Sequence, residues 1–133
     1  MKAKEILYRC RNGEAEVQQL QRRLSRMQKC GASEGAIRED VASCKASLDK
    51  RCRELDAEKI AACRIVDMLP DPTCGILYRY FVARQSQDCI VSALHIAVST
   101  YKKHKRVGLE MAEQMDDVLI DSLLPAWYTG REI

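Results

Sequence analysis

The chain has 133 residues, with 22 basic and 19 acidic side chains that give a formal net charge of +3. This length fits one compact domain, or one small domain with an extended helical element, and disfavours a multi-domain enzyme. Charged residues make up 31% and apolar residues 47% of the chain. We therefore expect a soluble globular protein with no membrane span.

The N-terminus and the cysteines indicate a reducing compartment. Charged residues at positions 2, 4 and 5 lead into no apolar stretch of signal-peptide length, so we expect a cytoplasmic protein. The seven cysteines show no paired spacing, and neither His95 nor His104 stands at a zinc-finger distance from a cysteine pair. We predict reduced thiols that pack as small apolar side chains, with no metal site and no cofactor.

The first half of the chain has the spacing of paired helices. Val17, Leu20, Leu24 and Met27 recur three or four residues apart, which predicts an amphipathic helix with a narrow apolar stripe. Two glycines and a serine in segment 31–35 then interrupt the pattern. Because narrow stripes are buried only against each other or another chain, residues 1–69 are predicted to form an antiparallel hairpin that dimerises the protein.

The second helix of this hairpin is predicted to run from about Ser33 to Met68, roughly 50 Å at 1.5 Å per residue. Its stripe keeps heptad spacing from Val41 to Leu69, although Arg51 and Glu58 occupy two of the positions. These charged residues weaken a simple dimeric coiled coil, and they either set the register or face solvent.

The pair Pro70 and Pro72 marks the clearest boundary, because helix cannot continue across both, and Thr73 can cap the next helix. Three helices of about 9, 8 and 17 residues are predicted within residues 70–117. Ser86 is the expected cap of the second, residues 95–98 form a break, and Ser99 or a neighbour caps the third. The inward faces carry Ile76, Leu77, Tyr80 and Phe81 in the first helix and Tyr101, Gly108, Leu109, Ala112 and Met115 in the third.

The third helix carries the most informative charge pattern. Segment 102–106 holds four permanent positive charges in five positions, and a run of acids follows at Glu110, Glu113, Asp116, Asp117 and Asp121. A short helix, a tight turn and a longer helix with a basic outer face are typical of a helix-turn-helix. The predicted DNA-binding residues are Ser99, Thr100, Lys102, Lys103, Lys105 and Arg106, with Lys105 snorkelling from the apolar side. A merely solvated basic face is the alternative.

These features resemble a known family. Segments 1–7, 69–72 and 77–81, together with Ser99–Leu109, are similar to phage and prophage regulators of the RinA and ArpU type, whose C-terminal part resembles region four of sigma factors. The resemblance implies a DNA-binding activator of phage late genes that acts in the bacterial cytoplasm and contacts RNA polymerase. The family places an aromatic and two acids after the serine of the first motif helix and a glycine in the turn, whereas this chain has Gln87, Asp88, Cys89 and His95.

Other functions stay open at this point. The hairpin can be the working part of a phage-encoded helical protein that binds or inhibits a host protein, or the chain can be a small terminase-like DNA-packaging component. No phosphate-binding loop or nucleophile arrangement is present in the sequence, so we predict no enzyme and no small-molecule substrate. The apolar tail 118–133 either packs on the three-helix unit or forms an interface anchored by Trp127 and Tyr128.

Overall fold

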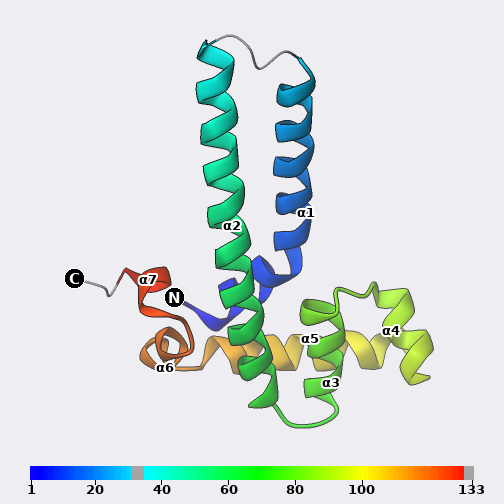
Figure 1. Cartoon of the computed structure of the whole chain (residues 1–133). Helices are drawn as coiled ribbons and strands as arrows, with labels where there is room; N and C mark the ends of the chain where they lie inside the picture. Colours follow the sequence, from blue (N-terminus) through cyan, green and yellow to red (C-terminus); the bar gives the residue numbers. More distant parts are fainter. Residues whose placement is uncertain (31–34, 131–133) are drawn as a thin grey trace. The chain divides into compact units, whose positions relative to one another are not determined.

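The computed structural model describes residues 1–30 and 35–130, and it confirms the all-α prediction, since the described residues contain helices and no strand (Figure 1). Most of the turn predicted at 31–35 lies outside these residues. None of the helices in the described part is long and apolar enough to cross a membrane. The elements are α1 (Ala3–Lys29), α2 (Gly35–Asp67), α3 (Thr73–Leu77), the π-helical turn η1 (Tyr78–Val82), α4 (Gln87–Leu94), α5 (Val98–Glu113), α6 (Asp117–Ser122) and α7 (Ala126–Thr129).

The chain divides into two compact units whose limits differ from the predicted ranges 1–69, 70–117 and 118–133. One unit, here called the arm, comprises residues 12–56, and the other, the base, comprises residues 1–11 and 57–133. The predicted boundaries are revised because both ends of the hairpin belong to the hydrophobic core of the base. Its core includes Ile6 and Ile65 of the hairpin helices together with Phe81, Ile90 and Ile120.

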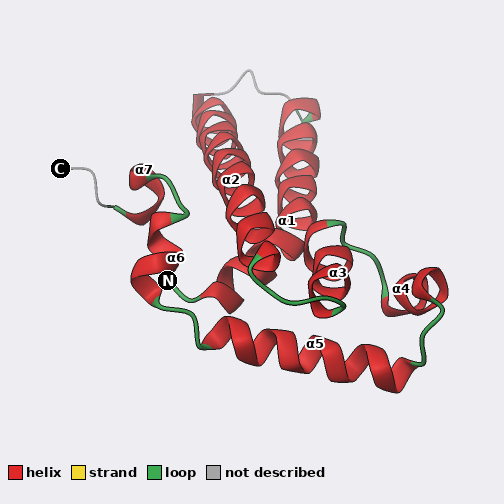
Figure 2. Cartoon of the chain, turned by 90° about the horizontal axis from the view of Figure 1, so that it is seen from below, coloured by secondary structure: helices red, strands yellow, loops and turns green. Residues whose placement is uncertain are grey.

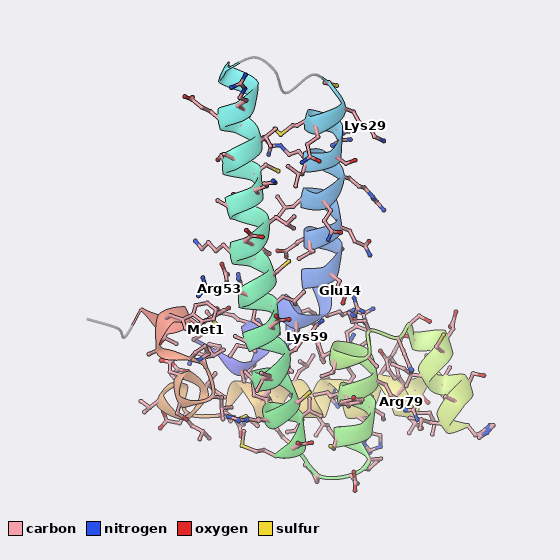
Figure 3. The ribbon with its side chains drawn as sticks, viewed as in Figure 1. Met1, Glu14, Lys29, Arg53, Lys59 and Arg79 are labelled. Atoms are coloured by element: carbon pink, nitrogen blue, oxygen red, sulfur yellow. The ribbon has the colours of Figure 1, made fainter. Side chains whose placement is uncertain are left out.

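The arm is an antiparallel helix pair, in which the C-terminal part of α1 lies beside the N-terminal part of α2 (Figures 1 and 3). The two helices approach closely at Gly13, where an added Cβ would lie 2.2 Å from Cδ1 of Leu55. Arg51 is buried, and its Nε donates to Oε2 of Glu16 at 2.7 Å. Arg51 therefore does not face solvent, because the ion pair with α1 replaces the apolar contact that its heptad position would make.

Glu58, the other charged position of the stripe, is fully buried in the base. Arg9 Nε donates to Glu58 Oε2 at 2.6 Å, and the hydroxyl of Tyr128 donates to the same carboxylate oxygen. Burial and the hydrogen bond to Glu58 raise the pKa of Tyr128. Glu58 therefore does not face solvent, because its carboxylate connects Arg9 with Tyr128. The tail packs on the core of the base through Ile120, Leu124 and Tyr128.

We expect Arg9→Ala to lower the free energy of unfolding by about 2 kcal/mol, because it removes the guanidinium whose Nε donates to the buried carboxylate of Glu58. The loss is smaller than for a fully buried pair, since the Arg9 side chain keeps 40% of its exposure. Urea unfolding measures the change. The matched control is Arg64→Ala, at an exposed position of α2 in the base, which should change stability by less than about 0.5 kcal/mol. Equal effects of the two variants would contradict a structural role for this ion pair.

The helix starts in the C-terminal part agree with the predictions at one of three positions. Ser86 caps α4, and its Oγ accepts a hydrogen bond from the backbone N–H of Cys89 at 3.2 Å. Thr73 is not a cap, because Pro72 occupies that position and Thr73 Oγ1 lies 3.4 Å from Nδ1 of His104 instead. Ser99 is not a cap either, since the extended backbone of Ala97 brings the chain into α5 one residue before it.

The seven cysteines are all unpaired, but their burial is uneven. Cys10 and Cys44 are buried as expected, and burial raises the pKa of the Cys10 thiol to about 11. Cys30 and Cys89 are exposed, because one follows the end of α1 and the other lies in the first turn of α4. The prediction that the cysteines pack as small apolar side chains therefore holds for only some of them.

Candidate nucleic-acid interface

Helices α4 and α5 are joined by the three residues His95 to Ala97, at the place where the sequence predicts the break (Figure 2). His95 adopts the left-handed conformation, with φ 53° and ψ 45°, and its backbone N–H donates to the carbonyl oxygen of Val91. Glycine would take this positive φ without steric cost. The histidine accepts a strain of order 1 kcal/mol, and the chain still makes the tight turn.

Packing of α5 on α3 orients the candidate interface. Tyr101, Gly108 and Ala112 form the buried face of α5, as predicted, and Leu109 and Met115 are half-buried. At Gly108 an added Cβ would lie 2.7 Å from Cγ2 of Thr73, so the two helix backbones approach closely. The opposite face of α5 is consequently turned to solvent.

That outward face carries four of the six predicted DNA-binding residues, since Ser99, Lys102, Lys103 and Arg106 are all exposed. In the part of the chain that the structure describes, neither Lys102 nor Lys103 has an ion-pair partner. Arg106 Nη1 lies 3.1 Å from Oε1 of Glu110, one turn further along α5. The two lysines therefore provide the uncompensated positive charge of this face.

Lys105 and Thr100 are half-buried at the sides of this face. Lys105 Nζ lies 3.7 Å from the centre of the Tyr80 ring, and the guanidinium carbon of Arg11 lies at the same distance from that ring. The predicted snorkelling of Lys105 thus takes the form of a cation–π contact. Sequence reasoning missed Arg11, because only the packing of α1 against η1 brings it to this site.

The acids that follow the basic run do not neutralise the two lysines. Three of them pair instead with cations at the start of the chain, at distances of 3.0 to 3.1 Å. The pairs are Glu113 with Lys4, Asp117 with Lys2, and Asp121 with the amino group of Met1. Asp116 caps α6 by accepting from the backbone N–H of Val118. Glu113 raises the pKa of Lys4 through a hydrogen bond and its charge.

The start of α5 adds a second source of positive potential. Ala97 supplies no side-chain cap to the helix, so the N–H groups of the first turn stay open to an external acceptor. Ser99 and Thr100 place hydroxyls in the same turn. The open N–H groups and the positive end of the helix dipole favour an anion at this position.

A groove of about 450 Å³ extends the cationic surface beside α5. Lys102, Lys105 and Arg106 line it from α5, and Lys4 and Tyr8 line it from α1. Glu110 and Glu113 also line it, and they pair with Arg106 and Lys4, so Lys102 and Lys105 supply its excess positive charge. Lysine, arginine and hydroxyl donors of this kind contact phosphate oxygens and the acceptor atoms of purine edges. The arrangement is therefore suited to an extended anion that carries hydrogen-bond acceptors.

Comparison of the chain with protein-family models, with curated proteins and with solved structures finds no match.

Proposed function

We propose that this protein binds double-stranded DNA through α4 and α5 and acts as a phage-type transcriptional regulator. In this proposal the N-terminal half of α5 enters the major groove, as the second helix of a helix-turn-helix does. Ser99, Lys102 and Lys103 face the DNA directly, and Arg106, Lys105 and Thr100 flank them. Phosphate contacts provide most of the affinity, and the first turns of α5 provide the contacts to base edges.

The proposal rests on which charged side chains of α5 have ion-pair partners and which do not. On a merely solvated helix face, a lysine is commonly balanced by an acid three or four residues away. Lys102 and Lys103 have no acid at either spacing, and the nearest acids along α5 pair with other cations, Glu110 with Arg106 and Glu113 with Lys4. The unpaired positive charge of this exposed face favours binding of a negatively charged partner.

The regulatory part of the proposal follows from the resemblance to RinA and ArpU type regulators. It comprises activation of phage late genes, contact with bacterial RNA polymerase, action in the host cytoplasm, and a homodimer whose two-fold symmetry sets the spacing of DNA half-sites. A helical inhibitor of a host protein needs no basic face on α5, so the unpaired lysines favour the regulator. A terminase-like packaging component predicts a ring-shaped assembly in place of a dimer.

A binding titration at two salt concentrations tests the proposal. The protein is titrated with the duplex upstream of its own neighbouring genes and with a random duplex of equal length. We expect tighter binding to the first, and an affinity that falls steeply as salt rises, because each phosphate contact releases condensed counterions. Absence of binding to either duplex at low salt would overturn the DNA-binding proposal.

A further inference from the structure

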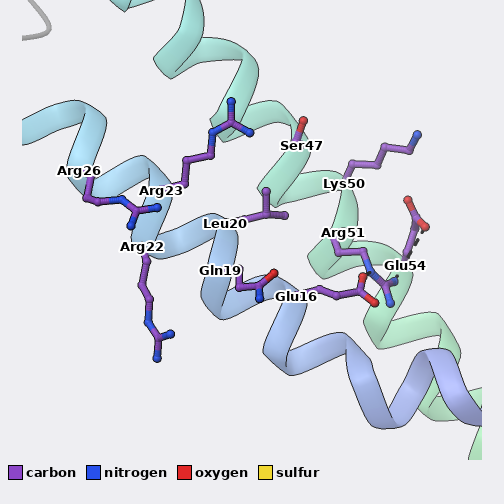
Figure 4. A pocket seen from close by; sticks show the side chains of 10 residues that line it. All are labelled: Glu16, Gln19, Leu20, Arg22, Arg23, Arg26, Ser47, Lys50, Arg51 and Glu54. Carbon is purple, nitrogen blue, oxygen red and sulfur yellow. Dashed lines mark hydrogen bonds and ion pairs between the residues drawn. The ribbon is translucent and has the colours of Figure 1, made fainter.

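The arm carries a second cationic surface, which the α5 site does not use. A groove of about 740 Å³ lies along the helix pair, entirely within the arm. Figure 4 shows its side chains, with Arg22, Arg23 and Arg26 from α1 and Lys50 from α2. Beyond the groove, Lys29 extends from the last turn of α1 (Figure 3).

The acids in the groove are already engaged. Glu16 Oε2 accepts from Arg51 at 2.7 Å, and Glu54 Oε2 lies 3.9 Å from the same guanidinium. Within residues 1–30 and 35–130, the other four cations of the groove have no ion-pair partner. The sequence between Glu16 and Gly31 contains no acidic residue at all. The positive charge of this groove is therefore uncompensated, as it is at Lys102 and Lys103.

The spacing of the cations suits a ligand with repeating negative charge. Arg22 and Arg26 are four residues apart on α1, which corresponds to about 6 Å along the helix axis. Arg23 lies between them in the sequence, but its side chain extends toward α2 whereas that of Arg22 extends away from it (Figure 4). Lys50 adds a charge from α2. A row of separate guanidinium groups can contact successive anionic groups on one chain, and arginine suits phosphate because its fork donates two parallel hydrogen bonds.

The composition of the groove favours a nucleic-acid backbone over an acidic protein helix. Leu20 is the one aliphatic residue among the described residues that line it, whereas protein interfaces draw their energy from buried apolar and aromatic anchors. The sequence from position 12 to 56 also contains no Phe, Trp or Tyr, so it offers no ring on which single-stranded bases could stack. A duplex fits such a groove better than a single strand, because its bases are already paired and its phosphates are accessible.

We infer that the arm groove binds the phosphate backbone of double-stranded DNA without reading its sequence, as a contact additional to α5. The inference rests on the proposed function, because it takes the protein to bind DNA. It predicts that the arm contributes to affinity for every duplex equally, while the preference between sequences belongs to α5.

The test compares charge-neutralising variants of the full-length chain in titrations with a mixed-sequence duplex over a range of salt. We expect Arg23→Gln with Arg26→Gln to reduce the slope of log affinity against log salt by about 2, and to weaken binding at least about tenfold at low salt. The ratio of affinities for specific and random duplex should stay unchanged. The matched control is Lys45→Gln with Arg64→Gln, which removes two exposed cations of α2 outside the groove. Circular dichroism verifies that both variants keep their helix content.

A third variant separates this inference from the proposed function. If Lys102→Gln with Lys103→Gln abolishes sequence preference while the groove variant matches its control, the arm inference is wrong and the function of α5 stands. If the groove variant lowers the slope and the α5 variant does not, the arm binds DNA and the assignment of α5 fails. Polyglutamate serves as a competing polyanion. Loss of polyglutamate binding in the groove variant, with duplex binding unchanged, would assign the groove to an acidic protein and overturn the inference.

Discussion

Lys102→Glu combined with Lys103→Glu should lower the affinity for duplex DNA by about 100-fold or more, because it places two negative charges where phosphates would lie. These two positions are the most informative choice, since both are exposed and neither has an ion-pair partner in the described part of the chain. Arg106 is less suitable, because Glu110 already shares its charge. Fluorescence anisotropy with a labelled duplex at constant salt measures the effect.

The control for this prediction reverses two charges elsewhere. Lys45→Glu with Arg64→Glu changes the net charge by the same amount, at exposed positions of α2. A general effect of net charge would weaken binding equally in both variants. We expect the α5 variant to lose far more affinity, with helix content and oligomeric state unchanged. Comparable losses in the two variants would remove α5 as the recognition helix.

Gly108→Val should lower the free energy of unfolding by about 3 kcal/mol, the upper part of the range for overpacking a close contact. An added Cβ at this position would lie 2.7 Å from Cγ2 of Thr73 and 2.8 Å from Cδ1 of Leu77. Both neighbours are buried, so they cannot move aside without disturbing the core. Because this contact holds α5 against α3, the variant should also weaken DNA binding. Chemical denaturation and the duplex titration give the two readouts.

Gly75 provides a matched control in the same unit. It lies within α3, it is exposed, and an added Cβ would have no atom within 4 Å. Gly75→Ala should therefore stabilise the protein by about 0.5 to 1 kcal/mol, since alanine loses less backbone entropy in a helix. Opposite signs for the two glycines are the expected result. If Gly108→Val were as harmless as Gly75→Ala, the close packing of α5 on α3 would be wrong.

The helices were predictable because their signals are local. The stripe from Val41 to Leu69 follows the helical period, and every one of its positions is buried or half-buried. Ser86 as a cap and the break at His95 also depend on a few adjacent residues. The outward direction of Lys102, Lys103 and Arg106 follows from the same periodicity once Tyr101 and Ala112 are taken as the inner face.

Other features depended on pairs of residues that are distant in sequence. Lys4 and Glu113 are 109 positions apart, and Arg11 reaches the backbone carbonyl of Tyr80 across 69. No periodicity reveals such pairs, because they form only when the ends of α1 and α2 pack with the C-terminal helices in one core. The same packing joined residues 1–11 and 57–69 to the base.

The sequence by itself determined the helical class, the extent of α2 and the basic face of α5, because each follows from side-chain spacing along a single helix. Only the tertiary structure decided that Arg51 and Glu58 are buried, since a charged side chain enters a core where a partner from another segment meets it. It also decided which charges stay unpaired. The tertiary structure alone therefore revealed the uncompensated cations of the α5 face and of the arm groove.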